Sequence, residues 1–281
     1  MSDIMTEKID FLPGTTTKYP QKLLNLAVTI WFIVTTIGQW AFGIYIIAFY
    51  GASTASGELE RWNEVLPHGY VKGDWKGNLI VGTHVLLAAI LVVGGPLQLL
   101  ASLRRSAPRI HRWLGRVYVS TAVIVATGGF IMVWTRGAVG DTVQHVSISI
   151  QTVYIIIFAW LAWRCARAGQ FEKHRKWAMR LFMVVSGVWF FRVGLMCWLV
   201  INGGPAGFDQ RTFSGPFLTA LAVLVYALPV SLLLLELYFY ARKAIKPVEI
   251  TAIALLIFMV AVLMAIGVFG AIAGMWLPRI G

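Results

Sequence analysis

The sequence predicts an all-α, polytopic membrane protein with about seven transmembrane helices. Hydrophobic residues make up 58% of the 281 residues and charged residues only 13%, whereas a soluble domain carries roughly 25% charged residues. Apolar runs of about 20 residues, the length that spans a bilayer core as a helix, recur along the whole chain. Helices are expected because lipid offers no partner for unpaired backbone N–H and C=O groups.

Seven apolar runs are the predicted membrane helices, and together they form a single transmembrane domain over residues 1–281. They cover residues 23–50, 78–101, 113–134, 142–163, 177–200, 216–240 and 248–275. The polar residues 1–22 contain no basic stretch followed by a short apolar core, so we expect a cytoplasmic tail and no cleavable signal peptide. Helices two to five are expected to form a central four-helix bundle.

Basic residues are distributed unequally between the two sets of connections. Seventeen lie in the tail and in every second connection: Lys8, Lys18, Lys22, Arg104, Arg105, Arg109, Arg112, Arg116, Arg164, Arg167, Lys173, Arg175, Lys176, Arg180, Arg242, Lys243 and Lys246. Six lie in the other connections: Arg61, Lys72, Lys76, Arg136, Arg211 and Arg279. Because Lys and Arg accumulate on the cytoplasmic side, the N-terminus is expected in the cytoplasm. The net charge of +12 therefore reflects topology in a lipid bilayer, and nucleic-acid binding is not expected.

The connections and cysteines add little chemistry. The longest connection, residues 51–77, is expected to carry a short amphipathic helix near residues 59–66. Its His68 has no second histidine with which it could form a cofactor site. Residues 202–216 are rich in Gly and Pro and predict an irregular turn. Cys165 and Cys197 form no Cys-x-x-Cys pair and are expected to be small buried residues.

Four histidines form a pattern that could hold a cofactor. His84 and His145 lie near the outer starts of the second and fourth helices, whereas His111 and His174 immediately precede the third and fifth. The words "HRWLGR" and "HRKWAMR" begin at His111 and His174, so the two helical hairpins resemble a weak internal repeat. Two imidazoles that face each other in a helical bundle are what axial ligation of haem requires. The pattern therefore predicts one haem between His84 and His145 and another between His111 and His174.

Small residues accompany these histidines along the predicted helices. From His111 the same face carries Gly115, Tyr118, Ala122, Ala126 and Gly129, because spacings of three, four and seven share one side of a helix. Such a stripe leaves room for a flat cofactor, but it also suits ordinary close packing of membrane helices.

Arg192 is a basic residue deep inside a predicted span, roughly 12 Å from its outer end. An intramembrane Arg is costly and normally faces a bundle interior or a watery cavity. It shares a helix face with His174 and lies at about the depth of the outer histidine pair, so a haem propionate is its expected counter-charge. Glu236, by contrast, is expected to pair with Arg242 or Lys243 at the inner end of the sixth helix.

The segment from His84 to Arg192 resembles known membrane proteins. "HVLLAAILVVGGPLQLL", "RRSAPRIHRWLGRVYV" and "EKHRKWAMRLF" are similar to an uncharacterised family of bacterial multi-pass membrane proteins with HRxxGRxY and HRxWMxR signatures. The second signature is imperfect here because Ala178 precedes Met179. The helix-opening word "HRWLGR" is also similar to di-haem b-type cytochromes of the transmembrane electron-transfer type, such as the ascorbate and ferric reductases. That resemblance implies paired histidines on four consecutive helices and a place in the bacterial inner membrane.

The leading hypothesis is a b-type cytochrome-like protein that moves electrons across the membrane between a reduced carrier, for which quinol is a candidate, and an acceptor on the other side. The four histidines would ligate one or two haems b. Arg192 would balance the outer propionates, and the inner propionates would be held by Arg112, Arg116, Arg175 and Arg180.

The alternative hypothesis is a haem-free accessory or assembly subunit of a larger membrane complex. Its two His-Arg motifs would bind lipid phosphates or the acidic surface of another membrane subunit through the guanidinium groups. The sequence therefore leaves open whether the chain is an enzyme.

Overall fold

The computed structural model describes residues 18–66, 68–137 and 140–280, and over these residues the chain is helical without a β-strand. Five helices are long and apolar enough to cross a membrane, and two bent helix pairs each make one further span, so the chain crosses up to seven times. This confirms the predicted fold class. Residues 1–17 of the predicted tail, which was expected to cover residues 1–22, lie outside the described residues.

The five continuous spans are α1 (Lys18–Ala55), α2 (Trp75–Leu99), α4 (Pro108–Arg136), α5 (Thr142–Arg167) and a final helix of α10 (Pro247–Ala271), η4 (Ile272–Trp276) and α11 (Leu277–Ile280). The bent pairs are α6 (Phe171–Val185) with α7 (Gly187–Asn202), and α8 (Pro216–Ala222) extended by η3 (Val223–Ala227) with α9 (Val230–Ala241). The short helices η2 (Leu59–Glu64) and α3 (Ala101–Ser106) lie in connections. The segment expected as an amphipathic helix near residues 59–66 is thus a 3₁₀-helix, η2.

Polar side chains from neighbouring helices hold the 49° bend between α6 and α7 at Ser186. Gln39 donates to the Ser186 hydroxyl at 2.9 Å, and Gln151 donates to the Val184 carbonyl at 2.6 Å. In lipid such side chains take over the bonding capacity that a broken helix leaves open. The 47° bend of the next span lies at Pro229, where proline has no N–H for the helix ladder.

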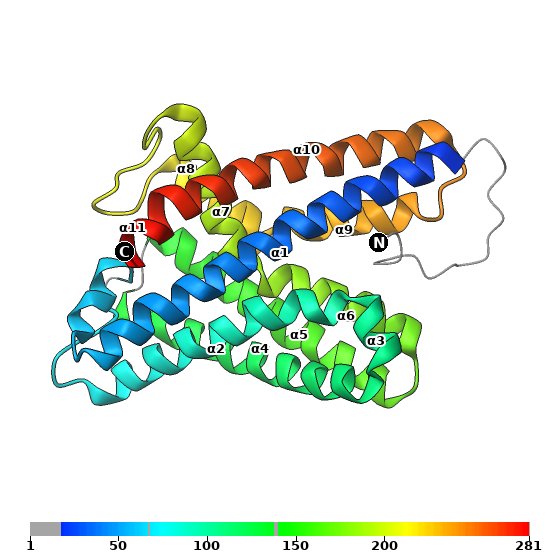
Figure 1. The fold of residues 1–281 in the computed structure, drawn as a ribbon. Helices are drawn as coiled ribbons and strands as arrows, with labels where there is room; N and C mark the ends of the chain where they lie inside the picture. The colour runs from blue at the N-terminus through cyan, green and yellow to red at the C-terminus, as the bar shows by residue number, and fades with distance from the viewer. Residues whose placement is uncertain (1–17, 67, 138–139, 281) are drawn as a thin grey trace.

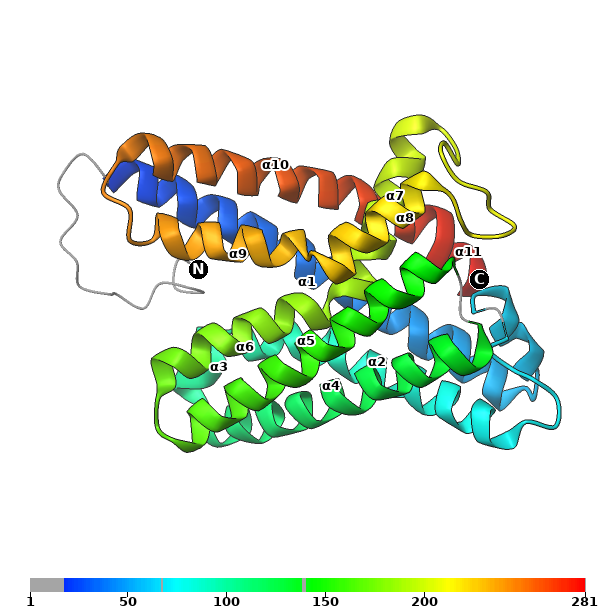
Figure 2. The same ribbon diagram turned by 180° about the vertical axis from the view of Figure 1, so that it is seen from behind.

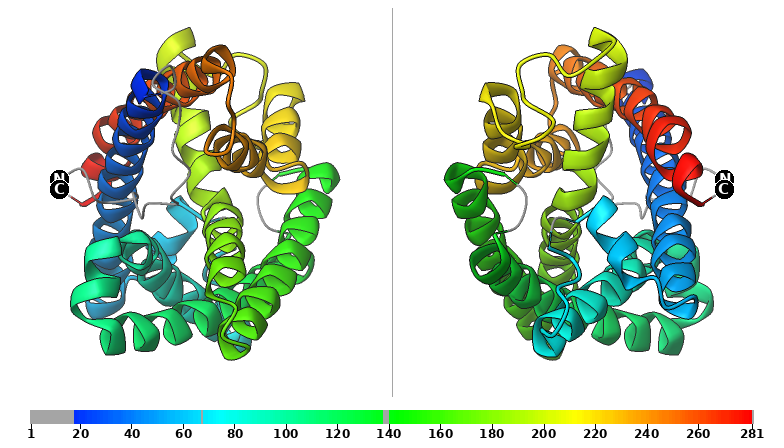
Figure 3. Two further views of the ribbon diagram at one scale, coloured as in Figure 1. Left: turned by 90° about the vertical axis from the view of Figure 1, so that its right-hand side faces the viewer. Right: turned by 90° about the vertical axis from the view of Figure 1, so that its left-hand side faces the viewer.

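The spans form two groups that diverge toward one end of the molecule (Figures 1 and 2). One group contains α1, α9 and α10, and the other contains α3, α4, α5 and α6. Helix α1 packs along α10 and also against α2. Figure 3, which looks along the bundle, shows α1 beside α10 on one flank and α5 on the opposite flank.

The basic connections gather at the end where the two groups diverge (Figure 1). This end, called the basic end below, carries the start of α1, helix α3 and the α5–α6 and α9–α10 connections. The opposite end, called the η2 end, carries η2, the α7–α8 connection and α11. The structure thus separates the two sets of Lys and Arg residues as the sequence predicts.

A compact apolar cluster fills the middle of the bundle made by α2, α4, α5 and α6. Its buried members are Leu91, Tyr118, Ala122, Ala126, Ile155, Ala159, Leu181 and Val184. This cluster includes three residues of the small-residue stripe predicted below His111. It lies between the level of His111 and His174 and the level of His84 and His145.

Candidate functional site

His111 and His174 lie inside helices and not before them. Helix α4 begins at Pro108 and α6 begins at Phe171, so both helices start before the predicted apolar spans, which begin at residues 113 and 177. Proline is well suited to the first turn because its missing N–H would be unpaired there anyway. Both helices continue past the apolar run into the basic end, which brings the two histidines into the bundle.

The two predicted inner histidines, His111 and His174, both lie in the first turns of their helices at the basic end. The Nδ1 atom of His174 lies 2.9 Å from the Ala162 carbonyl oxygen. A ring that donates from Nδ1 to a carbonyl keeps Nε2 free as a ligand and has a fixed orientation. His111 lies near enough for the charges of the two rings to interact, and its buried Nδ1 has no hydrogen-bond partner among the described residues.

The side chain of Gln98 lies close to this pair. It comes from α2, and a Cβ atom placed on Gly115 would lie 3.2 Å from its Oε1. Its buried Nε2 also lacks a hydrogen-bond partner in the part of the chain that the structure describes. Gly115, one of the small residues predicted on the same helix face as His111, therefore lets the Gln98 side chain approach α4 closely.

His84 packs against the backbone of α4 nearer the η2 end. A Cβ atom on Gly129 would lie 3.1 Å from Cε1 of His84, so any larger residue there would press on the ring. The Nδ1 atom of His84 is buried and finds no partner in the described segments. His145 contacts α4 farther along, with its ring edge-on to Trp134 at a centroid distance of 5.9 Å. The α4 residues that His84 and His145 contact, Gly129 and Trp134, are five positions apart, which corresponds to about 7.5 Å along the helix axis.

Arg192 lies in the interior of the η2 half of the molecule. Its guanidinium carbon is 5.2 Å from the Phe42 ring centroid, and Nη1 donates to the Val188 carbonyl at 3.3 Å. Its charge acts on groups from three other elements: His84 of α2, Tyr45 and Tyr50 of α1, and Tyr226 of η3. No carboxylate pairs with Arg192 among the residues described. Arg192 and His84 therefore share one region, as expected from their predicted depth.

Arg180 has a different partner from the one expected for its role at the inner pair. Its Nε donates to Glu236 at 2.7 Å, and its guanidinium carbon lies 4.6 Å from the Trp177 ring centroid. The expectation that Glu236 pairs with Arg242 or Lys243 is wrong, because α6 packs beside α9 and brings Arg180 closer. Arg242 donates instead to Asn25 of α1 at 3.1 Å.

The arginines that follow His111 face outward. Arg112 and Arg116 are exposed and line an open depression of about 550 Å³ together with Arg109, Ile110 and Trp113. Their positions are turned roughly 100–140° around α4 from His111. Arg175, the remaining arginine of the predicted set, follows His174 in the first turns of α6 and is half-buried.

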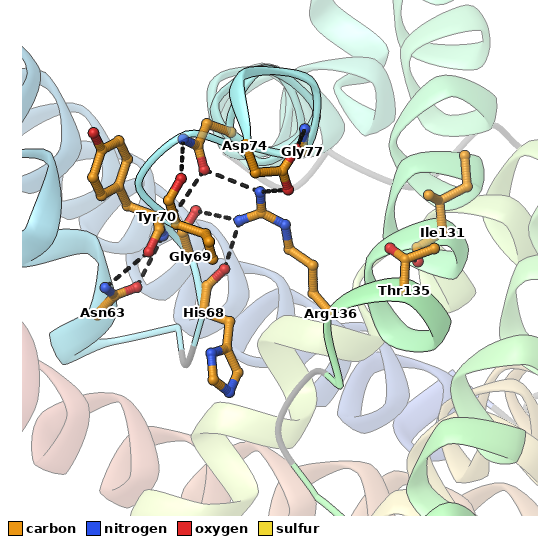
Figure 4. Close-up of polar contacts among 11 residues, drawn as sticks. Asn63, His68, Gly69, Tyr70, Asp74, Gly77, Ile131, Thr135 and Arg136 are labelled. Carbon is orange, nitrogen blue, oxygen red and sulfur yellow. Dashed lines mark hydrogen bonds and ion pairs between the residues drawn. The ribbon is translucent and has the colours of Figure 1, made fainter.

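An arginine that the sequence reasoning did not single out fastens the connection at the η2 end. Arg136, at the end of α4, donates from Nη1 to the carbonyls of His68 and Gly69 at 2.7 and 3.1 Å, and from Nη2 to Asp74 and Asn78 at 2.6 and 3.0 Å (Figure 4). Asn78 also bonds to both backbone groups of Val71. We call this set the Arg136 cluster.

The segment that the Arg136 cluster fastens covers the end of α2 that leads to His84. Trp62 of η2 is buried with Val81 and Met132, and a Cβ atom on Gly82 would lie 3.1 Å from its ring. Asp74 caps the start of α2 by accepting from the Gly77 amide. The sequence signal for this arrangement was limited to the polar start of α2, where Asp74 and Asn78 are four residues apart.

The buried ring nitrogens suit a haem better than a bare metal ion. In the described ranges there is no group of three or more His, Cys, Asp or Glu side chains that could hold a metal ion. The fixed ring of His174 and the unpartnered Nδ1 atoms of His111 and His84 are the donor type that haem iron accepts from proteins. At the basic end the residues present thus offer ring nitrogens of the type that a haem needs, whereas the ring of His84 already bonds to the backbone of Val125.

Comparison with known proteins gives a family and no function. Residues 81–239 match the family described as "Predicted membrane protein (DUF2306)", and this segment makes up more than half of the chain. The chain belongs to the DUF2306 family. The DUF2306 match runs from α2 into α9 and includes the four histidines and Arg192, whereas α1 and α10 lie outside it. No curated protein and no solved structure matches the chain.

Proposed function

We propose that this DUF2306 protein is a b-type cytochrome-like carrier that transfers electrons across the bacterial inner membrane, with its N-terminus in the cytoplasm. The observation that carries the proposal is the proximity of His111 and His174, which occupy equivalent places in two hairpins. The His174 ring is oriented by the Ala162 carbonyl at 2.9 Å, and the buried Nδ1 of His111 lacks a partner within the described residues. A haem bound there supplies one-electron redox chemistry.

The remaining residues of the proposed sites have distinct tasks. His111 and His174 hold the inner haem, and His84 and His145 hold an outer one. Arg192 offsets negative charge near His84, where its charge already acts on the ring. The apolar cluster between the two levels excludes water and sets the distance between them.

A lipophilic reductant such as a quinol is the donor that we propose for the inner haem. An apolar cavity of about 40 Å³ lies in the basic half, among residues of α1, α2, α6, α9 and α10 that include Trp31, Phe182 and Tyr238. The cavity is too small for a ring system as it stands, but its lining favours an apolar carrier over a charged one.

The test is a reduced-minus-oxidised absorption spectrum of protein purified from haem-replete cells. We expect a b-type haem signal that His111→Ala and His174→Ala each diminish. His68→Ala is the matched control, because His68 lies in the connection at the η2 end and its backbone carbonyl, which the substitution keeps, accepts from Arg136. A colourless, folded wild-type protein would refute the proposal.

A second candidate function is that of a haem-free accessory subunit that binds anionic lipid or a partner's acidic surface. The depression lined by Arg109, Arg112, Arg116 and Trp113 favours it, because guanidinium groups bind phosphates and carboxylates well and Trp suits the membrane interface. Co-purification of a stoichiometric partner with a colourless subunit, lost in Arg112→Glu, is the result expected for this function.

A further inference from the structure

Hydrogen-bond donors and positive charges gather at the η2 end, on the side of Arg192 that faces α1 and the last helix. The donors are Tyr45 of α1, Trp276 of η4 and Arg279 of α11, in addition to Arg192 of α7. Three of these four residues lie outside the segment that matches the DUF2306 family. The cluster is therefore a feature of this chain that the family match does not imply.

Ring stacking fixes the positions of these side chains. The Trp276 ring stacks on Phe42 at 5.2 Å and on Tyr45 at 6.2 Å between centroids. Arg192 lies over the same Phe42 ring at 5.2 Å. Arg279 follows Trp276 by three residues, which places both on neighbouring parts of one helix face.

Two of these side chains are buried, and their hydrogens lack an acceptor. Tyr45 and Trp276 are each only 2% exposed, and the Trp276 Nε1 has no hydrogen-bond partner among the described residues. Arg279 lies within hydrogen-bonding reach of the Tyr45 hydroxyl oxygen, but no acceptor for the hydroxyl hydrogen is found in the described segments. The Arg279 Nη1 donates to the Met275 carbonyl at 3.5 Å. Buried polar groups without a partner are costly, so these donors point to an acceptor that binds between them.

The charge of the region favours an anion as that acceptor. Both Arg192 and Arg279 act electrostatically on Tyr45 and on Tyr50. Glu64 also acts on Tyr45, but it lies 3.6 Å from Arg61 and is half-exposed. Two positive charges that act on the same two tyrosines favour an anion bound beside them.

A π-helical turn helps to build the cluster. Trp276 ends the π-turn η4, and Tyr226, which also feels the Arg192 charge, belongs to the second π-turn, η3. Single π-turns within α-helices are uncommon and frequently occur at functional sites. Both π-turns in the described chain thus direct an aromatic side chain toward the surroundings of Arg192.

We propose that Arg192, Arg279, Tyr45 and Trp276 form a binding site for a carboxylate at the η2 end. All four side chains can donate hydrogen bonds to the oxygens of a carboxylate group, and the two guanidinium groups supply its counter-charge. The carboxylate belongs either to a small diffusible organic acid or to a propionate of a haem bound near His84. The site itself does not depend on the cytochrome proposal.

The test measures thermal stability of the purified full chain against concentration of sodium acetate and sodium succinate, with sodium chloride at equal ionic strength as the reference. A ligand that binds only the folded state raises Tm in a saturable way. We expect such a rise for the carboxylates, with binding at least about tenfold weaker in Arg279→Gln and Tyr45→Phe, as expected for loss of a charge-assisted bond. Arg211→Gln, in the exposed α7–α8 connection, is the matched control and should bind like the wild type.

Two preparations distinguish the sources of the carboxylate. If protein from haem-deficient cells responds and haem-containing protein does not, a propionate occupies the site; if both respond, the ligand is diffusible. The proposal is overturned if neither preparation responds more to the carboxylates than to chloride, or if Arg279→Gln and Tyr45→Phe respond like the wild type. Protein from haem-replete cells that is colourless and still responds would refute the cytochrome proposal and leave the carboxylate site in place.

Discussion

Replacement of Arg136 by Gln should release the connection at the η2 end. The Arg136 side chain is 8% exposed, and its Nη1 alone donates to two backbone carbonyls, those of His68 and Gly69. Hydrogen bonds from a charged group contribute about 1.5–3 kcal/mol each. The loss of this pair is therefore expected to cost about 3 kcal/mol of local stability, or roughly a 150-fold rise in the open population.

Amide hydrogen exchange measures this opening directly. The amides of Gly69, Tyr70 and Val71 are bonded to Leu66, Asn63 and Asn78 when the connection is closed. Their exchange should accelerate by about two orders of magnitude in Arg136→Gln, while amides in the middle of the spans stay protected.

Arg136→Lys is the matched variant, because it keeps the charge but cannot form the forked set of bonds. It should fall between the wild type and Arg136→Gln. Unchanged exchange of the three amides in Arg136→Gln would refute the reasoning, since it would mean that other contacts hold the connection in place.

Two further perturbations follow from the same regions. Gly129→Val should displace the ring of His84, because even a Cβ atom at this position would lie 3.1 Å from the ring. Such overpacking is expected to cost about 1–3 kcal/mol of stability, which would be measured as a lower Tm. Gly94→Val in α2 is the control and should change Tm little, because a Cβ atom there would meet nothing within 4 Å. The amide of Gly77 and the Arg136 guanidinium lower the pKa of Asp74 below its usual 3.8, so its contribution to stability is complete above that pH and is lost as the pH falls through the lower folded value. Exchange of the connection, corrected for the intrinsic amide rate, should therefore stay slow at pH 5 and rise below about pH 3.8, and Asp74→Asn should abolish that pH dependence.

The spans were predictable because apolar runs of bilayer length are read directly from residue type. The ends of the helices were harder to predict, because α4 and α6 continue into segments rich in Arg and Lys, and a hydropathy pattern assigns such segments to the connections. The two bends were not predicted, because Ser186 lies within a continuous apolar run and the side chains that hold its bend, Gln39 and Gln151, come from other helices. A hydropathy pattern contains no information about such contacts.

Only some residues of the candidate site could likewise be predicted from the sequence. The repeat of the His-Arg words predicted which histidines would be equivalent, and the cost of an intramembrane charge singled out Arg192. Arg136 was counted only as a topology charge, because its partners, two backbone carbonyls and two side chains, lie 58–68 residues away in a distant connection. Tyr45 and Trp276 look like ordinary apolar residues until the structure leaves their polar atoms buried without a partner within the described residues.

The break at Ser186 also has a mechanical consequence. His174 lies on one side of it and Arg192 on the other, in two rods joined at a 49° angle. Besides the backbone bonds of Ser186 to Phe182 and Phe190, two amide side chains from other helices bond at this joint. The relative orientation of the two residues therefore depends on contacts with α1 and α5 and not on the span alone.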